Sequence, residues 1–292
     1  MKGKKYLKLC CSMMAFYMIS CNGSYTDFGE QYKKILYIVN SDDLLYENEH
    51  FYHNEKDSIT VSVYCSGSES IGRDVSVTLE LTTQALDSFN EIRKIVNPDF
   101  TKKVLLPESH YQFPKKKAVI RKGEQYGTLK IPFSMNGLEV DSNYVLPLKL
   151  ISNDQGYEIN PKLNTIIYEI KMMNGFSGEY SGSSTVLPGT VRSVQPVLKA
   201  ISSNSVRMPI HDLVDEKEFL DTHYMVLTIA DDSTQVSISA WRNAQIRDFG
   251  ESSYDKTNKS FELNYAYTDQ NGNELVIKEK IRDLSVTDEE EY

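Results

Sequence analysis

Apolar and polar residues alternate along most of the chain, so that every second residue is apolar in a series of short stretches. A period of two residues is typical of antiparallel sheets that bury one face and expose the other to water. The chain is therefore predicted to be all-β. The clearest stretches are residues 59–65, 75–81, 129–133, 144–150, 166–172, 225–229, 236–240, 261–267 and 275–281.

Two segments interrupt this alternation. Four apolar residues from Ala85 to Ile92 recur at the spacing of a helix, which predicts a short helix between strands. Residues 173–178, with the sequence MNGFSG, are rich in turn formers. The roughly 270 residues that follow the first twenty suit two domains better than one. We therefore place a domain boundary in the second segment, between β domains at residues 31–173 and 174–287.

Two local features refine the predicted strands. Pro147 has no N–H to donate to a sheet, so its strand is expected to lie at an edge or to be bulged there. Residues 269–273, with the sequence DQNGN, contain Asn-Gly and predict a tight hairpin turn. The same residues imitate the start of a calcium-binding loop, but Lys280 occupies the twelfth position, where such a loop needs an acid. A hairpin is therefore the preferred interpretation.

The N-terminus has the features of a secretory signal. Basic residues precede an apolar run, which at about 11 residues is too short for a membrane span of about 20. Residues 18–21, with the sequence MISC, resemble a bacterial lipobox. That resemblance implies removal of residues 1–20 and acylation of Cys21. The polar residues that follow indicate a tether at residues 21–30. An ordinary signal peptide with a chance cysteine is the alternative. Asn22 gives no inner-membrane retention signal, so we expect an outer-membrane anchor that faces the cell exterior.

Charge and cysteine content exclude some classes of protein. Loss of residues 1–20 would remove four lysines and no acid, which leaves 28 basic and 41 acidic residues and a net charge of −13. Such a surface repels phosphate backbones, so a nucleic-acid partner is not expected. Cys65 shares the apolar face of its alternating stretch and is expected to be a buried core residue, not a catalytic thiol.

Three segments of the first half resemble the immunoglobulin-like domain at the start of Bacteroidetes surface lipoproteins from polysaccharide-utilisation loci. They are residues 106–111 (LPESHY), 118–124 (AVIRKGE) and 138–148 (LEVDSNYVLPL). The resemblance implies an N-terminal immunoglobulin-like β-sandwich. It also implies an association with glycan capture and with outer-membrane transport proteins of the same system. It brings no catalytic motif to this chain.

The second half resembles a lipocalin-like companion domain. The resemblance lies in residues 176–182 (FSGEYSG), 254–255 (YD) and 261–265 (FELNY). It implies a second antiparallel β domain at residues 174–287, either a lipocalin-like barrel or another sandwich. Residues 288–292 are expected to be a solvated acidic tail.

Motifs for catalysis and for metal binding are lacking in the sequence. Glycoside hydrolysis needs two carboxylates that flank the bond, and no spacing rule pairs any two acids here. The five histidines do not follow a zinc-binding pattern, and phosphate-binding, dinucleotide-binding and nucleophile-elbow motifs do not occur. We therefore expect no catalytic residue, no metal and no cofactor, and the enzyme class is the least favoured.

Binding is the better prospect for this chain. Aromatic rings pack against the apolar faces of sugars, while polar side chains bond to the hydroxyls. Trp241 breaks the alternation of residues 236–240, and Arg242 and Asn243 follow it, so these three residues are the predicted ligand patch. A Trp packed against a barrel wall or under a loop is the alternative. Weaker candidates are Tyr111, Tyr126, Tyr254 and Tyr267.

The sequence therefore predicts a two-domain, all-β surface lipoprotein that binds a polysaccharide or glycan for uptake, without turnover. A structural or adhesin-type protein that binds other surface proteins is the alternative. In that case edge strands would be its natural docking points.

Overall fold

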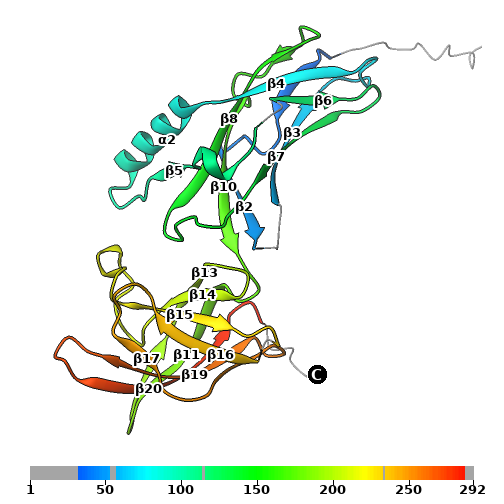
Figure 1. The fold of residues 1–292 in the computed structure, drawn as a ribbon. Helices are drawn as coiled ribbons and strands as arrows, with labels where there is room; N and C mark the ends of the chain where they lie inside the picture. Colours follow the sequence, from blue (N-terminus) through cyan, green and yellow to red (C-terminus); the bar gives the residue numbers. More distant parts are fainter. Residues whose placement is uncertain (1–31, 53–56, 114–115, 233, 287–292) are drawn as a thin grey trace, which may run out of the picture.

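The computed structural model of the chain describes residues 32–52, 57–113, 116–232 and 234–286. These residues form two ten-stranded sheets and one α-helix, which confirms the predicted all-β class (Figure 1). Cys21, the tether at residues 21–30 and the acidic tail at residues 288–292 lie outside the described residues. In the described part of the chain, no helix has both the length and the apolar character that a membrane span requires.

The N-terminal sheet curls into a half-barrel around one apolar core, with the order β2-β10-β8-β4-β6-β7-β3-β1-β9 and with β5 beside β8. Apolar residues alternate along most of these strands, so one side of the sheet forms a single hydrophobic core. Cys65 belongs to this core at 3% exposure, as predicted. The strands are β1 (Ile35–Ile38), β2 (Leu45–Phe51), β3 (Asp57–Cys65), β4 (Val75–Leu81), β5 (Lys103–Leu105), β6 (Lys117–Ile120), β7 (Tyr126–Phe133), β8 (Asn143–Asn153), β9 (Glu158–Ile159) and β10 (Thr165–Met173).

The predicted helix is present as α2 (Thr83–Val96), which lies on the outer side of the sheet beside β5 (Figure 1). Leu86 and Phe89 are buried against Val145 and Ile167 and form a small second core. Ile92, one of the four apolar residues at helical spacing, is 60% exposed. Ile95 and Val96 of the last turn are also exposed, so the small core holds only Leu86 and Phe89 of the helix.

Pro147 does not lie in an edge strand. It lies in β8, which has β10 on one side and both β4 and β5 on the other. The pairing with β5 ends at Val145 and the pairing with β4 begins at Leu148. Pro147 therefore falls where one neighbouring strand replaces the other, and its carbonyl accepts a hydrogen bond from the N–H of Thr82 at 3.1 Å. A residue without an N–H is tolerated there because the ladder is interrupted at that point.

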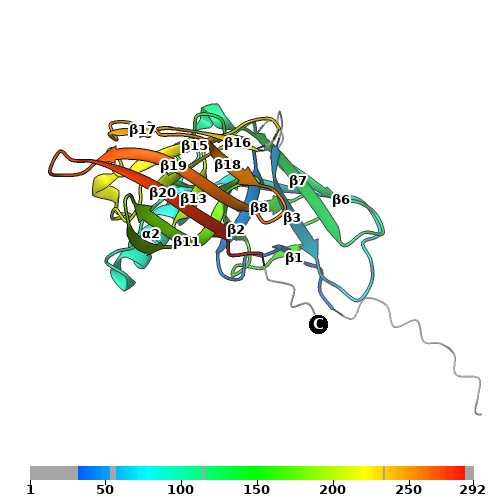
Figure 2. The same cartoon turned by 90° about the horizontal axis from the view of Figure 1, so that it is seen from below.

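The C-terminal sheet is a closed barrel of eight strands, β11-β13-β14-β15-β16-β18-β19-β20, in which β20 pairs with both β19 and β11 (Figure 2). β12 and β17 pair outside this ring with β11 and β19. The strands are β11 (Gly178–Val186), β12 (Thr190–Val194), β13 (Val197–Ala200), β14 (Ser205–Pro209), β15 (Tyr224–Ile229), β16 (Gln235–Ala240), β17 (Ile246–Asp248), β18 (Ser252–Asp255), β19 (Ser260–Thr268) and β20 (Glu274–Asp283).

The predicted hairpin at residues 269–273 joins β19 to β20. The N–H of Asp269 donates to the carbonyl of Asn273 at 2.9 Å, and Gly272 has φ +81°. The Asp269 carboxylate accepts the backbone N–H groups of Asn271 and Asn273, both at 2.8 Å. Glycine is needed at this position because other residues rarely adopt positive φ.

The chain passes from one sheet to the other between Met173, the last residue of β10, and Gly178, the first of β11. Asn174, buried in this connection, donates from its side-chain amide to the carbonyls of Ser202 and Ser205 at 2.7 and 2.9 Å. Its Oδ1 accepts the N–H of Phe176 at 2.9 Å. The connection is thus bonded to the barrel and does not act as a loose linker.

Candidate functional sites

The N-terminal sheet has a slot of about 460 Å³ between β2 and β3. Within the described residues, β2 pairs with β10 alone, and β3 has β1 beside it only from Val63 to Cys65. The sheet therefore leaves one side of β2 and the first part of β3 without a neighbouring strand. Backbone N–H and C=O groups of such edges are available to a ligand. The slot is thus a gap between two strand edges, and it is lined by the side chains around it.

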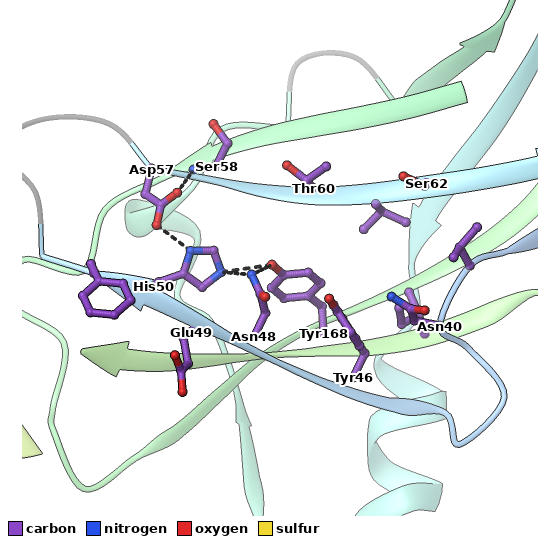
Figure 3. A pocket seen from close by; sticks show the side chains of 14 residues that line it. Asn40, Tyr46, Asn48, Glu49, His50, Asp57, Ser58, Thr60, Ser62 and Tyr168 are labelled. Carbon is purple, nitrogen blue, oxygen red and sulfur yellow. Dashed lines mark hydrogen bonds and ion pairs between the residues drawn. The ribbon is translucent and has the colours of Figure 1, made fainter. Parts of the chain in front are cut away.

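A hydrogen-bonded chain of side chains spans the slot (Figure 3). Nδ1 of His50 lies 2.5 Å from Oδ2 of Asp57, which joins β2 to β3. Nε2 of His50 lies 3.0 Å from the hydroxyl of Tyr168 in β10, and Asn48 donates to the same hydroxyl at 2.6 Å. Burial raises the pKa of Tyr168 to about 12, so the hydroxyl stays protonated at neutral pH. The network thus links side chains of β2, β3 and β10.

Further polar groups line the slot without belonging to that network. Tyr46 packs edge-on to Tyr168, with the ring centroids 5.5 Å apart. Thr60 is exposed, and Ser62 is half-buried beside it on the polar face of β3. An aromatic ring next to hydroxyls, an amide and a carboxylate is the combination that recognises the apolar and polar faces of a sugar.

The sequence did not predict this slot. His50 and Asp57 are seven residues apart and lie on different strands, and Tyr168 is more than a hundred residues away. No spacing rule relates the three. A weak signal exists in β2, where polar side chains occupy the positions that an edge strand turns towards solvent.

The three residues of the predicted patch lie after β16, and the structure separates them. The half-buried ring of Trp241 has the guanidinium groups of Arg207 and Arg242 at 5.5 and 5.4 Å from its centroid. Arg242, at φ +52°, pairs with Asp221 at 2.7 Å and with Glu139, in the connection between β7 and β8, at 3.1 Å. Trp241 and Arg242 therefore lie at the junction between the two sheets.

Asn243 has a different environment from its two neighbours. It lines a hollow of about 340 Å³ at one end of the barrel, together with Tyr267. Of the other candidate tyrosines, Tyr254 is buried in the barrel core, Tyr126 is 55% exposed on β7, and Tyr111 packs against the N-terminal core. Ligand binding by Trp241, Arg242 and Asn243 stays a prediction.

A polar network lies inside the otherwise apolar barrel. Glu279, 1% exposed, accepts a hydrogen bond from the hydroxyl of Tyr265 at 2.5 Å, and its Oε1 has no hydrogen-bond partner among the described residues. Burial raises the pKa of Glu279 to about 7, although the bond from Tyr265 acts in the opposite direction. Burial also raises the pKa of Tyr265, and the charge of Glu279 adds to this effect.

This network continues through the side chains of Ser184, His211 and Asp212. Their contacts run from serine to histidine to aspartate, as in the catalytic triad of a hydrolase. Oγ of Ser184 lies 2.7 Å from Nδ1 of His211, and Asp212 lies 3.2 Å from Nε2. In a working triad Nε2 faces the serine and Nδ1 faces the carboxylate, the reverse of what is found here. The Ser184 side chain is also fully buried, so a substrate cannot reach it. The geometry is that of a structural network.

Metal binding finds no support in the part of the chain that the structure describes. No three His, Cys, Asp or Glu side chains there are grouped closely enough to hold an ion.

Family models match both parts of the chain. A model of an N-terminal domain matches residues 32–156, and a model of a C-terminal domain matches residues 164–282. The two matches together span most of the chain, and residues 157–163 lie between them. The second match includes β10, although that strand pairs in the N-terminal sheet. No curated protein matches the sequence.

Several solved structures share this two-domain fold. A Bacteroides ovatus protein of unknown function has a TM-score of 0.64 at 15% identity, over 88% of this chain and 98% of its own. A second protein from the same organism, also of unknown function, has a TM-score of 0.61 at 21% identity, over 85% of this chain and 92% of its own. An auxiliary nutrient binding protein from Bacteroides thetaiotaomicron has a TM-score of 0.60 at 14% identity, over 83% of this chain and 90% of its own. At such identities the likeness concerns the fold.

Proposed function

We propose that this protein is a cell-surface lipoprotein that binds a polysaccharide or glycan for uptake and does not turn it over. The observation that carries the proposal is the slot between β2 and β3. It combines unpaired strand edges, the ring of Tyr46 and the hydroxyl of Thr60 in one concave site. The nutrient binding neighbour from Bacteroides thetaiotaomicron, which has the same fold, supports a binding role.

A glycan panel combined with two variants tests this proposal. Tyr46→Ala removes a ring from the slot, and Thr60→Ala removes an exposed hydroxyl. Loss of one hydrogen bond, at about 1 kcal/mol, predicts about fivefold weaker binding for Thr60→Ala, and loss of the ring predicts about tenfold or more. Thr128→Ala is the matched control, because Thr128 is exposed on the neighbouring strand β7 but lies outside the slot.

Two results would oppose the proposal. Saturable binding that neither slot variant weakens would show that the slot is not the binding site. Release of shortened sugars from any glycan of the panel would show turnover.

The lipid anchor and the location are part of the same proposal. We place the lipid on Cys21, the anchor in the outer membrane and the two domains outside the cell, beside the transport proteins that take up the glycan. A Cys21→Ser variant is expected to leave the membrane fraction, because one acylated cysteine holds the whole chain there. Mass spectrometry that shows an unmodified Cys21 in the membrane-bound protein would contradict this part.

A structural or adhesin-type role is the second candidate. The unpaired edges of β2 and β3 favour it, since an extended segment of another protein could add to either edge. Two results together would favour this role over the first. No glycan of the panel binds, and a surface protein co-purifies with the chain only when β2 is intact.

A further inference from the structure

The hollow at the end of the barrel has the composition of a second binding site. It lies between η2 (Lys217–Phe219), the segment that follows Trp241 and the β19–β20 hairpin. Its volume of about 340 Å³ falls in the range of small-ligand sites. It is lined by Ile210, Leu213, Phe219, Thr222, His223, Asn243, Gln245, Tyr267, Thr268, Asp269 and Gln270.

One wall of the hollow is a pair of stacked rings. Phe219 and His223 lie parallel, with 4.3 Å between centroids and 10° between planes. Nδ1 of His223 lies 3.1 Å from the carbonyl of Val214, so that nitrogen carries the proton. In the neutral ring Nε2 is then an acceptor, and among the described residues it has no hydrogen-bond partner. The wall therefore offers an apolar surface with one acceptor at its edge.

The rim of the hollow carries exposed amides. Asn243, Gln245 and Gln270 come from two different segments of the barrel. In the described part of the chain, the side chains of Asn243 and Gln270 have no hydrogen-bond partner, while Gln245 donates to the carbonyl of Asn243 at 3.3 Å. Each amide has both a donor and an acceptor and can therefore bond to a hydroxyl in either direction.

The backbone that carries these amides is held in place. The N–H of Asn243 donates to the carbonyl of Asp221 at 2.9 Å, and the N–H of Thr268 donates to the carbonyl of Gln245 at 3.0 Å. A site whose groups are already ordered loses less free energy when a ligand binds.

We infer that this hollow binds a neutral sugar unit, with its apolar face against the half-buried ring of Phe219, which His223 supports from behind, and its hydroxyls on the amides. The inference rests on the proposed glycan-binding function and adds a second site to it. The absence of lysine and arginine from the lining argues against an acidic sugar. Asp269 is the one carboxylate there, and its oxygens are already bonded to Asn271 and Asn273. Two sites on one chain favour a ligand with several sugar units.

Trp241 provides a reporter for this site. It is the only tryptophan of the chain, and it lies two residues before Asn243. Its ring faces the junction, but the N–H of Ala244 donates to its carbonyl at 3.1 Å, so it belongs to the segment that lines the hollow. A sugar that contacts Asn243 is therefore expected to change its fluorescence, whereas a sugar in the slot of the N-terminal sheet is not. Neutral oligosaccharides from mannan, xylan and β-glucan serve as probes, with binding followed by fluorescence and by calorimetry.

The double variant Asn243→Ala/Gln245→Ala is expected to lose the fluorescence response, because binding in the hollow becomes at least tenfold weaker. Calorimetry should still detect binding in the slot. Thr60→Ala should keep the response. Gln195→Ala is the matched control, because Gln195 is an exposed amide elsewhere on the barrel. Both altered residues are exposed, and circular dichroism with a melting curve verifies that the variant folds.

Two results overturn the inference in distinguishable ways. A fluorescence response that persists in the double variant, or calorimetry that detects one site only and is unchanged by the double variant, overturns the second site alone. Absence of binding by both methods for every probe overturns the proposed function, and the inference with it.

Discussion

Arg207 of the barrel and Asp141 of the N-terminal domain form a two-point ion pair across the junction. Nη2 of Arg207 lies 2.6 Å from Oδ1 of Asp141, and Nη1 bonds to the other oxygen. The Arg207 side chain is 1% exposed, and its guanidinium lies over the ring of Tyr224, 4.3 Å from the centroid. Lys199 adds a second cation at 3.1 Å. The two parallel hydrogen bonds of such a pair form only when the guanidinium and the carboxylate have one relative orientation. The pair therefore helps to fix the orientation of the two domains.

Asp141→Ala is predicted to destabilise the protein by about 3 to 5 kcal/mol, because it leaves the buried charge of Arg207 without its partner. Urea unfolding at neutral pH measures the change. We also expect the two domains to unfold in separate transitions once the pair is lost. Burial would raise the pKa of Asp141, but Arg207 and Lys199 hold it below its usual value, so this stabilisation is present at neutral pH and is lost in acid.

Glu139→Ala is the matched control for that prediction. Glu139 also crosses the junction, to Arg242, but both side chains of this pair are exposed. An exposed pair contributes less than about 1 kcal/mol. Equal losses in the two variants would show that burial of Arg207 does not decide the strength of the junction.

Glu279→Gln is predicted to change how stability depends on pH. The pKa of Glu279 is about 7 in the folded barrel and near 4.5 in the unfolded chain, so the folded state binds more protons between these values. Its effect on stability is therefore absent below about pH 4.5 and fully destabilising above about pH 7. Relative to the variant, the native protein should lose about 3 kcal/mol between pH 4.5 and 8.

Urea unfolding of both proteins across this range provides the measurement. Burial lowers the pKa of His211, with Asp212 opposing and Arg192 assisting the shift, but His211 titrates in both proteins and its effect largely cancels in the difference. Glu262→Gln is the control, because Glu262 is exposed on β19 and Lys280 lowers its pKa. A pH-independent difference between the native protein and Glu279→Gln would refute the prediction.

Gly182→Ala is predicted to disturb the closure of the barrel. Gly182 lies in β11 opposite β20, and a Cβ added there would lie 1.9 Å from the carbonyl oxygen of Lys280. Because backbone must move to make room, we expect a loss of at least about 2 kcal/mol, measured by thermal or urea unfolding. Gly189→Ala, whose Cβ would meet nothing within 4 Å, should change stability little. Similar losses in the two variants would count against this account.

Phe89→Ala is predicted to loosen α2 from the sheet. Phe89 is 6% exposed and packs edge-on to Phe100, with ring centroids 6.1 Å apart, so its loss should cost about 3 kcal/mol. Ile95→Ala, at an 81% exposed position of the same helix, should stay within about 0.5 kcal/mol. Hydrogen exchange of the α2 amides checks that the effect is local, and unchanged protection in Phe89→Ala would argue against it.

The sequence alone determined the β class, a short helix in the region of residues 85–92 and the hairpin at residues 269–273. These features depend on the alternation of side chains, on helical spacing and on the backbone preference of glycine, all of which act between residues close in the chain. Where short-range information sufficed, the prediction and the structure agree.

Tertiary structure alone decided the rest. The position of Pro147 in an interior strand, the meeting of His50, Asp57 and Tyr168 in the slot, and the burial of Glu279 inside the barrel each depend on which strands become neighbours. The same holds for Trp241 and Asn243, which are two residues apart yet face the junction and the hollow respectively. Alternation fixes the face on which a side chain lies, but strand pairing and barrel closure are long-range choices that determine what that side chain meets.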